Sequence, residues 1–214
     1  PLGGPGVPRR AAVLRSVPET EPHPSVVDGV DRAAAAMAAA GWDVVEAKPP
    51  EIGYCTEVWA YLLAADIAVL MDTARLVLSE ELTAALDETA NRYSPSVMAP
   101  TAVHSELARL AREWALFFID HPVLVMPTWT IPQPEHGFDQ GVGSTDAITS
   151  TLGCITPPNL LNLPSVAVPV GVSDGLPQGV QCVADRWRDD LALTAAADIE
   201  ASLGTLTPID PVLG

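Results

Sequence analysis

The sequence contains little lysine and few cysteines. Lys48 is the only lysine among 214 residues, so any lysine-based catalytic chemistry has a single candidate. Cys55, Cys154 and Cys182 lie far apart and form no C-x-x-C pair, which argues against a zinc knuckle and against a disulfide framework. We therefore predict reduced thiols in a cytoplasmic protein, with no metal and no cofactor.

Basic residues and long apolar runs are also scarce. Eleven basic residues stand against 27 acidic ones, and the net charge of -16 repels phosphate backbones and anionic membrane surfaces. The most apolar stretch, 58–71, is interrupted by Asp66 and is shorter than the roughly 20 residues of a membrane span. We therefore expect neither a nucleic acid nor a membrane as partner.

The length and the apolar content are those of a globular protein. The hydrophobic share is 48%, although aromatic residues make up only 5% of the chain. A chain of this length suits one sizeable domain or two small ones. Residues 1–10 lack both an initiator methionine and the order of charged and apolar segments found in signal peptides. We interpret this start as an interior cut or a trimmed end.

In the first 126 residues, short apolar runs alternate with amphipathic stretches. A strand at 11–15, a helix at 24–41 and a strand at 42–47 predict a right-handed crossover with two parallel strands. Helical periodicity follows at 54–93, with a second helix start at Ser79. A further helix is expected at 101–119 and a strand at 123–126.

The C-terminal third predicts a hairpin and a final helix. The run 165–170 is apolar at nearly every position, which predicts a strand covered on both faces, with Pro169 at its end or at a bulge. A turn and a strand at 179–184 follow, and a helix runs from Asp189 to a terminating Gly204. The expected fold is α/β: a mixed, mainly parallel sheet flanked by helices on both faces.

Residues 127–149 have no helical or strand periodicity and contain three prolines and three glycines. Structureless connections longer than about 12–15 residues are uncommon in compact domains unless they bind something or are disordered. This one leaves the C-terminal end of a predicted strand, where open α/β sheets place their ligands. We therefore predict that it forms a pocket wall, with a short helical piece after it at 151–163.

Four short motifs near the C-terminus resemble those that close the amidase signature family, serine amide hydrolases that use a Ser, a second Ser and a Lys. Asn162 stands where a glycine is usual, and Pro122, further upstream, stands where an aspartate is usual. The resemblance identifies residues 1–214 as the C-terminal portion of such a domain. The motifs are NLLNLP (159–164), PVG (169–171), GLPQGVQ (175–181) and RDD (188–190).

The resemblance implies amide hydrolysis, yet the catalytic residues of the family have no counterpart here. Its mechanism needs a nucleophile within hydrogen-bond reach of a buried base. Lys48 ends a predicted strand beside Pro49 and Pro50, and no serine has a serine neighbour. We therefore predict no catalytic residue in this chain, which alone would be inactive, and a Ser-Ser-Lys triad in a missing N-terminal part.

Two alternatives stay open at this point. The chain is either the C-terminal portion of an amidase that acts on a small-molecule amide, or a non-catalytic partner subunit or small-molecule-binding chain derived from the fold. A third, weaker interpretation is a remnant without function. The sequence decides neither the substrate nor whether the chain forms a homo-oligomer.

The resemblance also implies a set of substrate contacts. In the family, the loop matching 127–137 and the segment matching 150–158 border the acyl pocket. Trp129 and Ile131 would equally suit a plug in a surface hydrophobic seam. Cys154 has no histidine near it in sequence, so a small packed residue is the alternative to a substrate contact. The predicted contacts are Thr128, Trp129, Ile131, Cys154 and Ile155.

Overall fold

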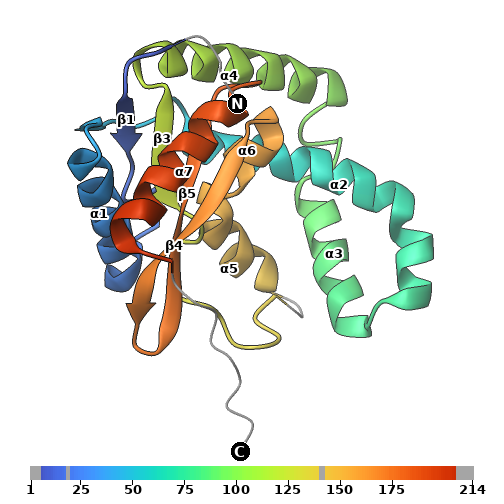
Figure 1. Cartoon of the computed structure of the whole chain (residues 1–214). Coiled ribbons are helices and arrows are strands. Elements are labelled where there is room, and N and C mark those ends of the chain that lie inside the picture. Colours follow the sequence, from blue (N-terminus) through green and yellow to red (C-terminus); the bar gives the residue numbers. More distant parts are fainter. Residues whose placement is uncertain (1–5, 18–19, 140–142, 206–214) are drawn as a thin grey trace, which may run out of the picture.

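The computed structural model describes residues 6–17, 20–139 and 143–205 and contains a five-stranded sheet in the order β2-β1-β3-β5-β4 (Figure 1). The first three strands in the chain are parallel, whereas β5 runs antiparallel to both β3 and β4. This confirms the predicted crossover and hairpin. The strands are β1 (Arg10–Val13), β2 (Asp43–Glu46), β3 (Val123–Pro127), β4 (Ser165–Ser173) and β5 (Leu176–Ala184).

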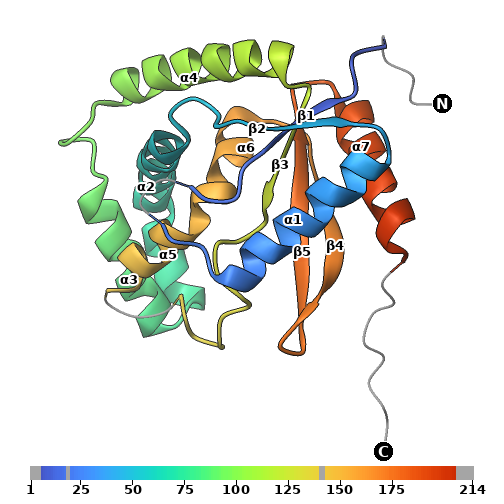
Figure 2. The same cartoon turned by 90° about the vertical axis from the view of Figure 1, so that its left-hand side faces the viewer.

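Helices cover both faces of the sheet, as predicted (Figure 2). On one face, α1 and α7 enclose a core cluster that includes Met37 and Val125. On the other, α2, α4 and α6 enclose a cluster that includes Trp114 and Leu124. The helices are α1 (Pro24–Ala39), α2 (Ile52–Val77), α3 (Glu80–Arg92), α4 (Pro100–Asp120), α5 (Ser144–Thr151), the 3-10 turn η1 (Leu152–Cys154), α6 (Thr156–Leu161) and α7 (Asp189–Leu203).

The strand β3 carries the core on both faces. All five of its residues are buried, and successive side chains point to opposite sides of the sheet. Leu124 belongs to the cluster beneath α2, and Val125 to the cluster beneath α1 and α7. This central strand leads directly into the loop at Thr128, so the sheet fixes where the loop begins.

The edge strand β4 differs from the prediction that both of its faces are covered. Val168 and Val170 are buried against α1 and α7, whereas Ala167 and Pro169 on the other face are exposed. The prediction of full burial is therefore wrong, because nothing among the described residues covers that face. The bulge is confirmed, since the register shifts between Pro169 and Gly171.

The predicted loop 127–149 is too long at its C-terminal end, because residues from Ser144 onward are helical. This helix, α5, begins after Gly143, whose φ of 87° lies in the left-handed region. The Gly143 amide donates a hydrogen bond to Glu88 Oε2 of α3 at 2.8 Å. A contact with a distant helix thus fixes the start of α5.

Other predicted boundaries are confirmed within a few residues. The predicted second helix start is confirmed, because Ser79 caps α3 and its hydroxyl accepts a hydrogen bond from the Leu82 amide. Gly204 terminates α7. Among the described residues, none of the helices has the length and apolar character needed to cross a bilayer.

Candidate functional site

The loop that follows β3 brings three of the five predicted contact residues to one small cavity. Thr128, Trp129 and Ile131 line a space of about 150 Å³ together with residues of α1 and β5. The Thr128 hydroxyl donates to the Gly179 carbonyl at 3.4 Å, which ties the start of the loop to β5. The loop therefore forms a cavity wall, and substrate contact by these residues stays a prediction.

Cys154 and Ile155 lie apart from that cavity. The Cys154 side chain is fully buried in the core cluster beneath α2, and Ile155 is half-buried just before α6. Burial raises the pKa of the Cys154 thiol to about 12, so the reactive thiolate is almost absent at neutral pH. This environment fits a packed residue, and substrate contact by either side chain remains untested.

Gln181 joins the two segments that carry the predicted contacts. Its buried amide donates to the Pro127 carbonyl at 2.9 Å and to the Cys154 carbonyl at 2.8 Å. Its oxygen accepts a hydrogen bond from the Ser165 hydroxyl at 2.8 Å. One side chain on β5 therefore links the end of β3, the turn η1 and the edge strand β4.

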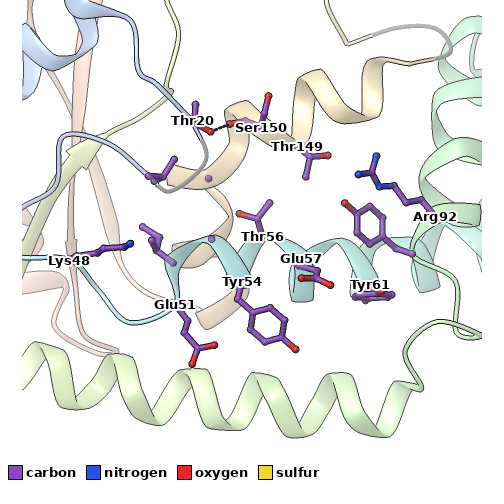
Figure 3. A pocket seen from close by; sticks show the side chains of 15 residues that line it. Thr20, Lys48, Glu51, Tyr54, Thr56, Glu57, Tyr61, Arg92, Thr149 and Ser150 are labelled. Atoms are coloured by element: carbon purple, nitrogen blue, oxygen red, sulfur yellow. Dashed lines mark hydrogen bonds between the residues drawn. The ribbon is translucent and has the colours of Figure 1, made fainter.

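A larger cavity, of about 900 Å³, lies over the first turns of α2 and was not predicted (Figure 3). Thr149 and Ser150 of α5 line the side of the cavity that is opposite α4. The Thr20 hydroxyl donates a hydrogen bond to the Ser150 carbonyl at 2.7 Å. Lys48 lies at one side of the view, and Arg92 at the other. The cavity is thus built from segments that are distant in sequence.

A polar stripe on α2 forms one wall of this cavity. Tyr54, Glu57 and Tyr61 follow one another at spacings of three and four residues, so they share one helix face. The Tyr61 ring packs edge-on against Tyr93 at a centroid distance of 5.2 Å. Burial, followed by the charge of Glu57, raises the pKa of Tyr61, so this phenol stays protonated at neutral pH. The spacing of these three residues is visible in the sequence and could have predicted this cavity wall.

Glu51 marks the corner at which α2 begins. It adopts a left-handed conformation with φ of 43°, which is unusual for a residue with a side chain. Arg109 of α4 binds its carboxylate through two nitrogens, at 2.7 and 2.9 Å. These hydrogen bonds lower the pKa of Glu51. The Trp114 indole donates to the Pro50 carbonyl at 2.9 Å, so α4 holds this corner at two points.

Lys48 lies just before that corner and is exposed. It lines the large cavity together with the hydroxyl-bearing residues Thr56 and Ser150. Thr56 is buried and shares a hydrogen bond of 2.7 Å with the hydroxyl of Thr156. A base for a serine nucleophile is normally activated by burial, and the exposed position of Lys48 does not supply this.

Comparison with known proteins identifies the family. The model of the Amidase family matches residues 6–193 of this chain. The chain belongs to the amidase signature family. An indoleacetamide hydrolase from Bradyrhizobium japonicum is 33% identical over 96% of the chain, and a 6-aminohexanoate-cyclic-dimer hydrolase from Pseudomonas sp. (strain NK87) is 29% identical over 80%.

Solved amidase structures have the same fold. A 6-aminohexanoate cyclic dimer hydrolase complexed with substrate superposes with a TM-score of 0.72 and 25% identity, covering 95% of this chain and 47% of its own. The allophanate hydrolase of Kluyveromyces lactis gives a TM-score of 0.70 at 18% identity, covering 92% and 33%. The chain likewise spans only 46% and 39% of the two curated relatives named above.

Proposed function

We propose that this chain acts as the C-terminal portion of an amide hydrolase, in which it supplies core strands and one side of the substrate pocket. The serine nucleophile, the bridging serine and the lysine base would come from a part of the protein outside these 214 residues. The family match over residues 6–193 carries this proposal. The relatives named as amide hydrolases support it, since the chain matches less than half of each.

The cavity lining supports a binding role rather than a catalytic one for this chain. The large cavity presents phenols, two carboxylates and hydroxyls, which are suited to hydrogen bonds with an amide. Its only lysine is the exposed Lys48. We further propose that Thr128, Trp129 and Ile131 contact the substrate, because they line a cavity beside β5.

The test is amide hydrolysis by the 214-residue chain and by a version extended into the coding sequence upstream of Pro1. Acetamide serves as the small substrate and 2-naphthylacetamide as the aryl one. We expect activity in the extended protein alone. Activity in the 214-residue chain would refute the proposal that the nucleophile lies outside it. Absence of hydrolysis by both proteins would contradict the hydrolase proposal.

A second candidate function is a non-catalytic partner subunit or a small-molecule-binding chain. The presence of more than one cavity in a chain whose single lysine is exposed favours it as the alternative. In that case both proteins would bind 2-naphthylacetamide without hydrolysing it. Calorimetric titration of each protein, followed by product analysis, separates the two functions.

A further inference from the structure

A second large cavity, of about 660 Å³, lies between α2, α3, α5 and the loop after β3. It is separate from the large polar cavity and is here called the apolar chamber. Its volume lies within the range of about 300–1,000 Å³ that is typical of small-molecule sites. Its lining includes Leu63, Ile67, Ala85, Leu86, Ile148 and Leu152.

Three helices each direct one face toward the apolar chamber. On α3, Leu82, Ala85, Leu86 and Thr89 recur at spacings of three, four and seven residues and therefore form one stripe. Ile148 lines the chamber from α5 in the same way. Regular helix faces thus form one part of the chamber wall, and the loop after β3 forms the other.

The chamber walls lie outside the two hydrophobic cores. Ile67 and Ala85 are buried, with 8% and 5% of their surface exposed, yet neither belongs to the core clusters on the two faces of the sheet. Their side chains line the chamber instead. Apolar walls of this kind favour an apolar ligand, because burial of its surface is the main source of binding free energy.

Polar groups of the chamber are concentrated at its loop side. Glu135, His136 and Asp139 are exposed there, so this side faces solvent. Thr89 and Thr145 bring their hydroxyls to 3.3 Å where α3 meets α5, which satisfies both groups. A ligand that enters from the loop side would therefore keep its polar end near solvent and place its apolar end against α2 and α3.

We propose that the apolar chamber holds the bulky apolar group of the substrate, an aryl or branched alkyl substituent, while the amide group stays outside it. This inference rests on the proposed amide hydrolysis and deepens it by giving the substrate class. Ala85 is then a specificity-determining residue, because any larger side chain at this position projects into the space for that substituent.

The test compares Ala85→Phe with Ala68→Phe, a matched change at an exposed position on α2. Both variants are made in the protein extended upstream of Pro1. We expect Ala85→Phe to lower kcat/KM for 2-naphthylacetamide about tenfold or more and to leave acetamide hydrolysis within about twofold. Ala68→Phe should change neither. Equal effects of Ala85→Phe on the two amides, or no effect on either, would overturn the proposal.

Two further measurements keep the test decisive. If the extended protein hydrolyses neither amide, the proposed function fails, and calorimetric titration of 2-naphthylacetamide into the same proteins still tests the chamber. Ala85→Phe must then weaken binding about tenfold relative to Ala68→Phe, or the inference is wrong. If Ala85→Phe does not fold, Leu86→Ala is used instead, because this change widens the chamber. It should raise the ratio of kcat/KM for a biphenyl amide to that for the naphthyl amide. An unchanged ratio would contradict the inference.

Discussion

At the scale of single residues, the corner at Glu51 shows how a strained backbone is held in place. A side-chain-bearing residue in the left-handed region costs roughly 1–3 kcal/mol and persists only where its surroundings fix it. Here Arg109 binds the carboxylate and Trp114 binds the preceding carbonyl. The same corner carries Lys48 and begins the polar wall of α2, so its geometry shapes the large cavity.

The Glu51–Arg109 pair predicts a pH-dependent contribution to stability. Because Arg109 lowers the pKa of Glu51 in the folded protein, the contribution is full above the ordinary value near 4.5 and disappears as pH falls through the lowered pKa. Glu51→Gln should therefore lower Tm at pH 7 by about 2 °C or less, since both side chains are partly exposed. Thermal unfolding from pH 7 to pH 2 checks this. A Tm difference of the same size at pH 2 would contradict it.

The three cysteines form a second residue-scale prediction. Burial raises the pKa of Cys55, Cys154 and Cys182 to about 12. At pH 8 only about one thiol in ten thousand is then a thiolate, and reagent access is also blocked. We expect a colorimetric thiol reagent to modify none of them in the native protein and all three in urea. Rapid modification of a native thiol would show that the core opens locally.

At the scale of elements, most helices and strands could be predicted because their apolar spacing and their caps agree. Ser79 and Gly204 act as boundaries through local chemistry that a sequence displays. The helix α5 could not be predicted, since its start depends on Gly143 and on a bond from a helix 55 residues away. The exposed face of β4 was also not predicted, because an apolar run in the sequence does not indicate which other elements will cover each face of the strand.

The candidate site was predictable only in part. The loop after β3 was found because its composition and its place after a strand are visible in the sequence. The large cavity and the apolar chamber combine residues from α2, α3 and α5, and only tertiary packing brings these together. The stripe of Tyr54, Glu57 and Tyr61 was the one local signal, a polar face on an otherwise apolar helix.

Gln181 provides the prediction at this scale, because it connects four elements. Gln181→Leu would leave two buried carbonyls without donors, and we expect a loss of about 2–4 kcal/mol in the free energy of unfolding. Ser165→Ala removes only the bond to the amide oxygen and should cost about 1 kcal/mol. Urea unfolding of both variants checks the order. Equal losses would mean that the two carbonyls find other donors.

At the scale of the whole molecule, the sheet is covered unevenly. Helices enclose both faces around β3, but the face of β4 that carries Ala167 and Pro169 lies open. An apolar edge strand with one open face is a surface on which further chain can pack. In the proposed complete enzyme, the part that carries the catalytic triad would cover it.

Thiol labelling tests this cover, because the native cysteines are all buried. Ala167→Cys should react readily in the 214-residue chain and about tenfold or more slowly in the protein extended upstream of Pro1. Ser202→Cys, on the exposed side of α7, serves as the control and should react equally in both. Equal labelling of Ala167→Cys in the two proteins would show that this face stays open, which favours the non-catalytic binding role.

The short helix α5 lies between the large polar cavity and the apolar chamber. Thr149 and Ser150 line the polar cavity, whereas Thr145, Ile148 and Leu152 line the apolar chamber. A ligand that shifts this helix from one side must alter affinity on the other, and linkage requires the two effects to be equal. Occupation of the chamber by one molecule would then act as an allosteric signal that changes how tightly the polar cavity holds a second molecule.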